Sequence, residues 1–365
     1  MGKKIIISGG GTGGHIFPAI AIANALKEID PATEILFVGA EGKIEMQKVP
    51  AAGYPIKALP VSGFERKISF RNFKTILGLI KSIAKSRRIL LDFKPDAVVG
   101  VGGYASGPLV YVANLKGIPS LLQEQNSFPG VTNKLLAKKA KKICVAYDGM
   151  EKYFDPAKII KTGNPVRKDL YLNSTDKKTA LEFFGLEQNK KTILVLGGSG
   201  GAKTMNESVI SKLDKIENSN VQIIWQAGKF YYQKCLDALT KYQGNNIKLF
   251  DFINRMDLAY VSADIVLSRS GAGTISELCL AAKASVLVPS PNVAEDHQTK
   301  NAMALVKNNA AILIKDSEGV EKLLNQALLL AENNLLIKEL SENIFKMAIH
   351  HSDKLIAEEI FKICS

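Results

Sequence analysis

The chain has 365 residues, 46% of them hydrophobic, which suits about two ordinary domains and excludes a disordered protein. No apolar run approaches the roughly 20 residues that span a bilayer, and the first residues lack the long apolar core of a signal peptide. The net charge of +13 lies mostly in the first half, where residues 1–166 contain 24 Lys/Arg against 12 Asp/Glu. That half is expected to face an anionic partner, such as nucleic acid, an acidic membrane or a phosphorylated substrate.

Short apolar runs alternate with helical patterns along the chain, which is typical of parallel sheets built from βαβ units. The strands predicted in the first half are 4–7, 34–38, 97–100, 120–122 and 142–146. Those predicted in the second half are 192–196, 221–226, 247–250, 265–268, 285–288 and 311–314. Glycine and proline at 162–165 predict a joint between the halves. The sequence therefore predicts an α/β chain with two doubly wound domains.

Glycine-rich stretches follow four of the predicted strands, at the carboxyl ends where such sheets bind ligands. They are residues 9–14 and 102–107 in the first half, and 197–201 and 271–273 in the second. A glycine turn lets the backbone approach an anion, and the N–H groups of a following helix then bind it. One such stretch is equally well explained as a tight turn, but four at matching positions favour a phosphorylated ligand.

The first stretch, Gly9-x-Gly11-x-x-Gly14, also fits the dinucleotide-binding fingerprint. That function requires an acidic residue at the tip of the second strand to hold a ribose. Here the strand runs into Gly39 and Ala40 without an acid, since Glu34 is at its wrong end. The nicotinamide interpretation is therefore disfavoured.

His15 follows the last glycine of the first stretch. At a helix N-terminus the dipole disfavours a cationic imidazole. The ring would remain neutral and able to accept a proton, as a general base must. A helix-capping or core histidine is the alternative, and both interpretations remain open on the sequence alone.

Longer motifs surround these features in one order along the chain. They are residues 10–18, 102–108, 124–126, 162–167, 196–202, 269–277 and 296–302. Together they resemble the MurG family, whose members are UDP-GlcNAc transferases acting on the undecaprenyl-pyrophosphate-linked precursor of peptidoglycan. The motifs occur in the family's order across most of the chain, so the resemblance is specific.

The resemblance implies the GT-B fold, with two Rossmann-like doubly wound parallel-sheet domains facing across a cleft. It implies an acceptor- and membrane-facing domain over residues 1–163 and a UDP-GlcNAc-binding domain over residues 164–345. The C-terminal helix, residues 346–365, is expected to return to the first domain. The implied product is lipid II, made from lipid I for peptidoglycan synthesis and so for cell shape and division.

The family's residue roles carry over to matching positions. Those implied to bind UDP-GlcNAc are Thr12, Gly13, Gly14, Asn126, Arg167, Ser199, Ile253, Ala272, Gly273, Thr274, Ile275, Ser276, Glu277, Gln298 and Asn301. Those implied to cradle the acceptor diphosphate are Gly13, Gly14, Tyr104, Ala105 and Ser106. Ile253 is implied to contact uracil through its backbone, and Glu277 to accept hydrogen bonds from the ribose. Gln298 and Asn301 are implied to read the GlcNAc hydroxyls.

Some of these roles have alternatives. Thr274 and Glu277 also fit a capping box, in which the glutamate ties off a helix N-terminus. Gln298 and Asn301 also fit ordinary exposed positions of a helix. Glu124 is assigned as a second catalytic polar group in the cleft, with a turn residue as the alternative.

The resemblance implies an inverting transfer, in which the MurNAc 4-hydroxyl attacks the anomeric carbon and UDP leaves from the opposite face. His15 is the predicted general base, or it orients the acceptor diphosphate without taking the proton. Backbone donors at a helix start can stabilise the leaving UDP without a metal. The four cysteines are scattered and no acidic cluster has metal spacing, so neither metal nor cofactor is expected.

A lipid-linked acceptor implies a peripheral protein at the cytoplasmic face of the bacterial cell membrane. Segment 68–94 carries apolar residues at helical spacing with basic residues around them, a pattern that can lie in an anionic interface. The residues predicted to contact the membrane are Arg71, Phe73, Lys74, Ile76, Leu79 and Ile80. A helix buried on a Rossmann sheet shows the same stripe, so that alternative stays open.

The predicted partners are UDP-GlcNAc, a lipid-linked MurNAc-pentapeptide, the anionic inner-membrane surface and other cell-wall synthesis proteins. A glycolipid synthase of the same fold, with a diacylglycerol acceptor, is one rival, disfavoured by motifs 102–108 and 124–126. A nucleotide-dependent oxidoreductase is the second. A nucleic-acid-binding module is the third, and it would leave the four glycine stretches unexplained, so no nucleic acid is expected as a partner.

Overall fold

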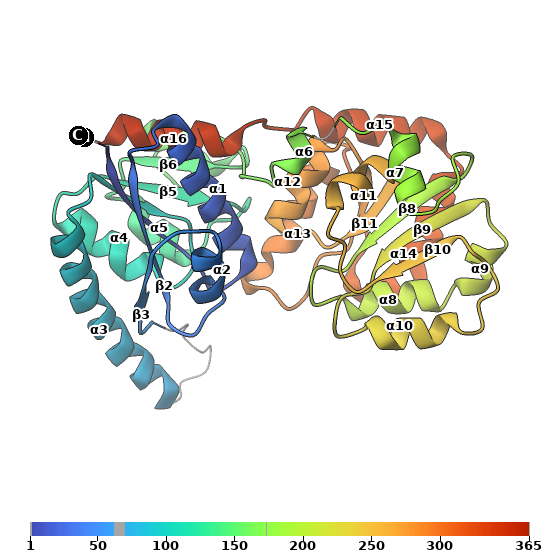
Figure 1. Ribbon diagram of the computed structural model, residues 1–365, viewed down its shortest axis with the longest axis horizontal. Coiled ribbons are helices and arrows are strands. Elements are labelled where there is room, and N and C mark those ends of the chain that lie inside the picture. Colours follow the sequence, from blue (N-terminus) through green and yellow to red (C-terminus); the bar gives the residue numbers. More distant parts are fainter. Residues whose placement is uncertain (1, 62–69, 173, 365) are drawn as a thin grey trace. The chain divides into compact units, whose positions relative to one another are not determined.

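The computed structural model describes residues 2–61, 70–172 and 174–364 (Figure 1). The chain divides into two compact units, the first formed by Met1–Val166 with Ile349–Ser365 and the second by Arg167–Ala348. Each unit contains one sheet in which every strand pairs parallel to its neighbours. The strand order is β3-β2-β1-β4-β5-β6-β7 in the first unit and β10-β9-β8-β11-β12-β13 in the second.

The first unit alternates strands and helices along the chain. Its strands are β1 Lys4–Ser8, β2 Glu34–Ala40, β3 Ile56–Leu59, β4 Ala97–Gly100, β5 Ser120–Glu124, β6 Lys142–Val145 and β7 Ile159–Lys161. Its helices are α1 Gly13–Ile29, α2 Glu45–Ala51, α3 Phe70–Phe93, α4 Ser106–Leu115, α5 Val131–Ala137 and α16 Ser352–Ile363, with short 3-10 turns at Met150–Lys152 and Pro156–Lys158.

The second unit repeats this alternation. Its strands are β8 Lys191–Leu196, β9 Val221–Gln226, β10 Ile247–Phe250, β11 Ile265–Ser268, β12 Ala284–Leu287 and β13 Ile312–Leu313. Its helices are α6 Asp169–Leu172, α7 Lys177–Phe183, α8 Lys203–Ile210, α9 Leu213–Glu217, α10 Tyr232–Leu239, α11 Met256–Ser262, α12 Ala272–Leu280, α13 His297–Val306, α14 Asp316–Ala331 and α15 Asn334–Phe345, with a 3-10 turn at Ala294–Asp296.

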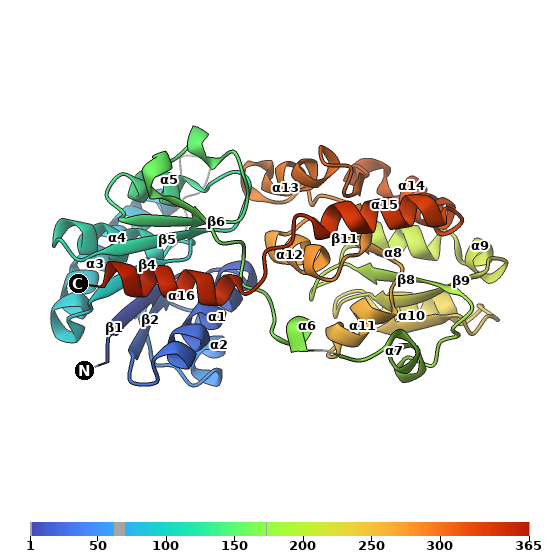
Figure 2. The same cartoon turned by 90° about the horizontal axis from the view of Figure 1, so that it is seen from above.

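Helices cover both faces of the first sheet because successive side chains of a strand point to opposite sides. Ile5 and Ile7 of β1 pack with residues of α1 and α16 on one face. Ile6 packs with residues of α3, α4 and α5 on the other face. Helix α16 lies beside α1 (Figure 2), so the last helix of the chain completes the core of the first unit.

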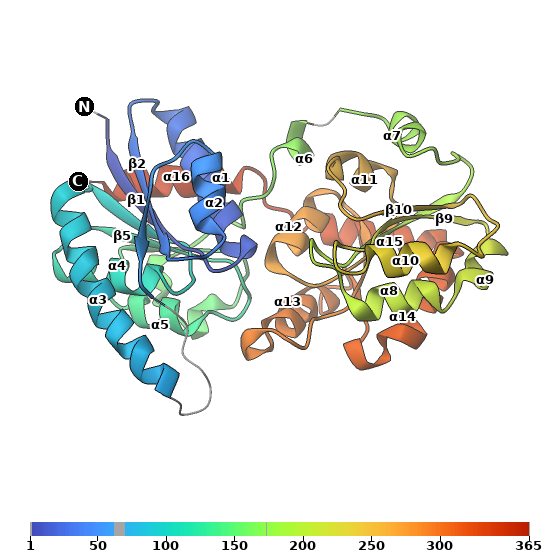
Figure 3. The same cartoon turned by 60° about the horizontal axis from the view of Figure 1, so that its bottom comes forward.

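One face of the second sheet is covered by α8, α10 and α14. Ile193 and Val195 of β8 meet Met205 of α8 and Leu323 of α14 in one buried cluster. Helices α8 and α14 lie against each other (Figure 3). The strands are buried on the other face as well, where Leu194 and Val266 are fully inaccessible, as a fully parallel sheet requires.

The predicted strands all occur, with ends shifted by a residue or two. Two strands, β3 and β7, were missed by the sequence analysis. Both lie at the edges of the first sheet, where a strand has one neighbour and is only partly buried. Such short, half-exposed strands have too few apolar residues to stand out in the sequence.

Candidate functional site

The first two glycine stretches lie side by side at the carboxyl edge of the first sheet, because β1 pairs with β4. We call residues 9–14 the β1 loop and residues 102–107 the β4 loop. A Cβ on Gly103, whose φ is +83°, would stand 2.2 Å from the carbonyl oxygen of Gly10. The two loops thus approach each other backbone to backbone, which only glycine permits at this position.

His15 lies in the first turn of α1, over the contact between these loops. Its Nδ1 is 3.1 Å from Oγ1 of Thr12, the N-cap residue of α1. A Cβ on Gly102 would stand 2.7 Å from Cδ2 of the ring and 2.9 Å from Nε2. The hydroxyl and the bare glycine together fix the orientation of a half-buried imidazole. The structure therefore places the predicted base at the carboxyl edge of the sheet, where ligands bind.

Glu45 is a residue of this loop region that the sequence analysis missed. It begins α2 and is fully buried, and its Oε2 accepts a hydrogen bond from the Gly11 N–H at 2.9 Å. Its Oε1 accepts from the Ala40 N–H, also at 2.9 Å. The carboxylate thus lies close to the tip of β2, although Glu45 comes five residues after the last residue of that strand, Ala40. Both its oxygens hold backbone, so it braces the β1 loop.

The residues predicted for the acceptor diphosphate lie around the start of α4. Tyr104 is exposed, whereas Ala105 and Ser106 are buried. The Ser106 hydroxyl donates to the Gly103 carbonyl at 2.9 Å. Ser106 therefore shapes the β4 loop through its side chain, and the backbone N–H groups of this turn are suited to an anion.

Glu124 holds a turn together. Its carboxylate is buried and accepts hydrogen bonds from Asn126 N at 3.0 Å and from Gly130 N at 3.2 Å. It also accepts from the side chains of Asn126 at 3.3 Å and Asn133 at 2.8 Å. Burial raises the pKa of Glu124, and these hydrogen bonds oppose the rise. Both oxygens are engaged, which favours the turn alternative over the predicted catalytic role, and Asn126 is fixed by the same turn.

The third glycine stretch follows β8, and we call residues 197–202 the β8 loop. Gly201 has φ of +85°, and a Cβ there would stand 2.2 Å from the carbonyl oxygen of Ala227. Gly198 and Ser199, by contrast, are exposed. The loop is therefore packed at its far end and accessible at its tip.

A buried amide joins the β8 loop to residues 251–255, which we call the β10 loop. Gln226, the last residue of β9, donates to the Gly198 carbonyl at 3.2 Å. Its Oε1 accepts from Ile253 N–H at 2.9 Å, and Ile253 itself is buried. The backbone predicted to contact uracil is thus held by a residue that the sequence analysis did not identify.

Glu277 lies on α12, whose N-cap is Gly271 without a side-chain cap. Its Oε2 accepts a hydrogen bond from the hydroxyl of buried Tyr260 at 2.9 Å. The capping-box alternative is wrong, because Thr274 lies two positions inside the helix and Glu277 bonds to α11 instead. Burial raises the pKa of Glu277 to about 7, and the Tyr260 hydrogen bond and the Arg167 charge oppose the rise.

Arg167 and Glu277 interact electrostatically. Against the effect of burial, the Glu277 carboxylate raises the pKa of Arg167, and the Arg167 charge opposes the rise in the pKa of Glu277. The Arg167 guanidinium forms a two-pronged ion pair with Asp169, at 2.7 Å from Nε to Oδ1 and 2.7 Å from Nη2 to Oδ2. Nη2 also lies 3.4 Å from the Asn254 carbonyl oxygen of the β10 loop. Arg167, Glu277 and the β10 loop therefore form one polar cluster in the second unit.

The two residues predicted to read GlcNAc differ in exposure. Gln298 is half-buried, and its Oε1 accepts from Ser290 N at 2.8 Å. Asn301 is fully buried, and its amide lies 3.5 Å from the Ser270 carbonyl. Asn301 therefore supports the loop before α12, and its contact with GlcNAc stays a prediction.

Helix α3 has an exposed apolar stretch. Ile76 and Ile80 are 46% and 57% exposed, while Leu79 is half-buried. The later residues Ile89 and Leu90 are buried against the sheet, so the buried-face alternative applies to that end of the helix. The side chains of Arg71, Phe73 and Lys74 lie outside the described residues.

Two kinds of feature are absent from the described parts of the chain. None of their helices is both long and apolar enough to cross a bilayer. Nor do three or more His, Cys, Asp or Glu side chains gather there in a way that could hold a metal ion.

Comparison with known proteins decides the family. Residues 5–145 match the glycosyltransferase family 28 N-terminal domain, and residues 192–360 match the C-terminal domain of that family. A Phocaeicola vulgatus protein is 56% identical over 363 residues, 99% of this chain and 96% of its own. It is named UDP-N-acetylglucosamine–N-acetylmuramyl-(pentapeptide) pyrophosphoryl-undecaprenol N-acetylglucosamine transferase. A Parabacteroides distasonis protein of the same name is 57% identical over 360 residues, 99% of this chain and 98% of its own. This chain belongs to the MurG family.

A solved structure of the MurG family has the same fold. The crystal structure of Acinetobacter baumannii MurG matches with a TM-score of 0.80 and 28% sequence identity, over 99% of both chains. The predicted family and the GT-B class are therefore confirmed. A MurG-family match over nearly the whole chain does not favour the glycolipid synthase or the oxidoreductase.

Proposed function

We propose that this chain carries out the MurG-family reaction, moving GlcNAc from UDP-GlcNAc to the 4-hydroxyl of MurNAc in lipid I to give lipid II. The roles are assigned from one observation. In each unit, glycine-rich backbone lies beside one ionisable side chain suited to a part of the reaction. In the first unit the imidazole of His15 lies over two packed glycine loops. In the second, the carboxylate of Glu277 lies on the helix that follows a glycine stretch.

The donor is assigned to the carboxyl edge of the second sheet. The β8 loop and the N-terminus of α12 would receive the diphosphate, because backbone N–H groups and the helix dipole favour an anion. Ser199 lies at the exposed tip of the β8 loop. Ile253 would contact uracil, and Glu277, oriented by Tyr260, would accept hydrogen bonds from the ribose. Gln298 would meet the sugar.

The acceptor is assigned to the first unit, where the start of α1 at Gly13 and Gly14 and the start of α4 offer backbone donors. His15 would take the proton from the MurNAc 4-hydroxyl as that oxygen bonds to the anomeric carbon. The bond from the anomeric carbon to the UDP oxygen breaks with its electron pair leaving on UDP. A general base of this kind contributes about 10²–10⁴-fold to the rate.

The test is transfer of labelled GlcNAc from UDP-GlcNAc to a lipid-linked MurNAc-pentapeptide by the full chain. We expect transfer to MurNAc and none to diacylglycerol. Glu277→Ala should raise KM for UDP-GlcNAc and leave KM for the acceptor unchanged. A folded, UDP-binding chain that glycosylates only diacylglycerol would contradict the proposal and identify the glycolipid synthase.

Membrane contact is a separate part of the proposal. The exposed residues Ile76 and Ile80 on α3, and the basic excess of residues 1–166, suit a peripheral position at the cytoplasmic face of an anionic membrane. Contacts with other cell-wall synthesis proteins stay a prediction. Cosedimentation with vesicles containing phosphatidylglycerol should fall for Ile76→Glu/Ile80→Glu. Leu329→Glu, at a leucine 62% exposed on α14, is the matched control and should bind normally. Equal binding by all three proteins would contradict this contact.

A further inference from the structure

Gln226 joins two loops that belong to different strands. It ends β9, which lies between β8 and β10 in the sheet, and its side chain is 5% exposed. One end of its amide donates to Gly198 in the β8 loop, and the other accepts from Ile253 in the β10 loop. A single neutral side chain therefore connects the loops on both sides of its own strand.

The backbone beside Gln226 is held on the β8 side independently of that amide. Asn206 of α8 accepts from the Trp225 indole at 2.9 Å and donates to the Ala227 carbonyl at 2.9 Å. A Cβ on Gly228 would stand 2.1 Å from Gly201 N, so the chain after β9 packs directly on the β8 loop. Loss of the Gln226 amide would leave these contacts in place, whereas the β10 loop would lose its bond to Gln226.

We propose that Gln226 is a positioning residue that sets the spacing between the base-contacting and the diphosphate-binding backbone of the donor site. This inference rests on the proposed function, which assigns Ile253 to uracil and the β8 loop to the diphosphate. Uracil and diphosphate are the two ends of one ligand. Simultaneous contact with both raises affinity only when the two loops are held at the matching distance, as for any linked pair of binding groups.

The lack of charge on Gln226 matters as much as the two hydrogen bonds of its side chain. A glutamate at position 226 would still accept from Ile253 N–H but could not donate to the Gly198 carbonyl when ionised. It would also place a negative charge beside the loop assigned to the diphosphate. Gln226→Glu is therefore expected to weaken UDP more than uridine, whereas Gln226→Met removes both hydrogen bonds without adding charge.

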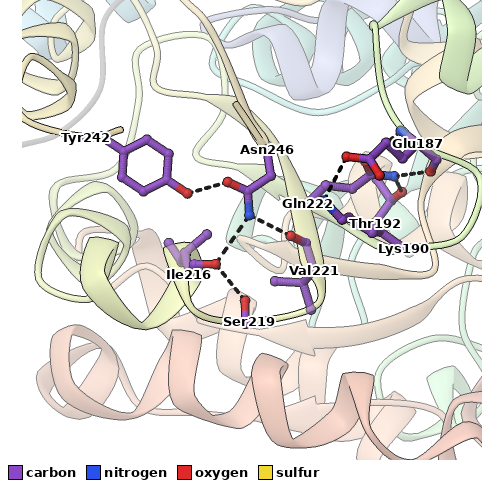
Figure 4. A network of polar contacts seen from close by, with 9 residues as sticks. All are labelled: Glu187, Lys190, Thr192, Ile216, Ser219, Val221, Gln222, Tyr242 and Asn246. Carbon is purple, nitrogen blue, oxygen red and sulfur yellow. Dashed lines mark hydrogen bonds and ion pairs between the residues drawn. The ribbon is translucent and has the colours of Figure 1, made fainter. Parts of the chain in front are cut away.

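Gln222 provides a matched control on the same strand. It is 1% exposed, and its amide also makes buried hydrogen bonds, with Glu187 and with Thr192 at the start of β8 (Figure 4). It lies four residues before Gln226, towards the opposite end of β9 from the assigned donor site. Gln222→Met should destabilise the fold as Gln226→Met does, because both leave buried groups unpaired, but it should not change donor affinity.

The experiment is calorimetric titration of UDP and of uridine into the full-length wild type, Gln226→Met, Gln226→Glu and Gln222→Met, with circular dichroism to verify folding. We expect Gln226→Met to raise the Kd for UDP about tenfold, which is about 1.4 kcal/mol, and to leave the Kd for uridine nearly unchanged. Uridine touches only one of the two loops, so their spacing should not affect it.

Three results would overturn the inference, and they differ in whether the proposed function still stands. Equal UDP affinity in wild type and both Gln226 variants would refute it and leave the proposed function intact. Equal weakening in Gln222→Met and Gln226→Met would reduce Gln226 to a fold-stabilising residue. A folded wild type that binds no UDP would refute the proposed function itself and this inference with it. If Gln226→Met does not fold, Gln226→Asn replaces it, because this shorter neutral amide cannot reach both loops and adds no charge. An unchanged ratio of UDP to uridine affinity in Gln226→Asn would then overturn the inference.

Discussion

The β1 loop and the β8 loop occupy equivalent places, each following the first strand of its unit, but the two are braced differently. Below the β1 loop lies a buried carboxylate, Glu45, which accepts from Gly11 N–H. Below the β8 loop lies a neutral amide, Gln226, which donates to the Gly198 carbonyl. A carboxylate takes N–H groups away from an incoming anion, whereas an amide that holds a carbonyl leaves them available.

This difference predicts which part of each loop would bind phosphate in the proposed function. In the first unit, the Gly11 N–H already has an anionic partner, so an acceptor diphosphate would be bound further on, at the start of α1 beside His15. In the second unit the tip of the β8 loop itself remains suited to a diphosphate. In the proposed roles, the same sequence feature therefore places the base in one unit and receives the leaving group in the other.

The largest expected effect comes from the residue that distinguishes the first loop. His15→Ala should lower turnover by about 10²–10⁴-fold, because the proposed base is lost, while UDP binding by calorimetry stays as in wild type. Thr12→Val removes the hydroxyl at 3.1 Å from the ring and should cause a smaller fall by loosening its orientation. Full turnover in His15→Ala would show that His15 is not the base. The β1 and β8 loops would then differ only in the residues that brace them.

Glu45 tests the bracing directly. Glu45→Ala leaves the Gly11 and Ala40 N–H groups without their carboxylate, and an unsatisfied buried donor costs about 1–3 kcal/mol. We expect the free energy of unfolding in urea to fall by about 2–6 kcal/mol, the cost of two such donors. Glu45→Gln keeps one acceptor oxygen and should lose less. If Glu45→Gln has both wild-type stability and wild-type KM for the acceptor, the negative charge is not what separates the two loops.

The sequence predicted both sheets and all four glycine stretches, since long buried strands and glycine turns leave strong local signals. It also selected His15, which directly follows a glycine stretch, and the family resemblance selected Glu277. It missed Glu45, Gln226 and Tyr260. Apart from the Ala40 N–H, five residues from Glu45, their partners lie 17 to 34 residues away in the sequence. A side chain that braces a loop from another element has no local pattern, so only the packed structure brings it to the site.

The same lack of local signal applies to Glu124 and Asn301. Both stand in motifs beside predicted ligand-binding positions, and a motif does not tell a contact from a support. In the structure both residues are buried, and the Glu124 carboxylate accepts four hydrogen bonds. Residues that lie at a site in sequence can thus serve it from underneath.

The smallest expected effect concerns pH and the donor side of the comparison. The pKa of Glu277 is raised from 4.5 to about 7, so the carboxylate forms as the pH rises through about 7. Donor affinity should therefore increase from pH 6 to pH 8, about one unit either side of that value. The same raised pKa works against the fold over this range, since stability from this group is present below 4.5 and lost as the pH rises through about 7.

Tyr260→Phe separates this titration from any other. Removing the hydroxyl removes a hydrogen bond that lowers the pKa of Glu277, so the midpoint of UDP affinity against pH should move upwards. Glu277→Gln should abolish the dependence, because the amide does not titrate. If the profile of Tyr260→Phe shifts downwards, or if Glu277→Gln keeps the wild-type profile, an ionisable group other than Glu277 controls the pH dependence of donor binding. The comparison of the two units would then lose its donor-side residue, as it would lose its acceptor-side residue if His15→Ala kept full turnover.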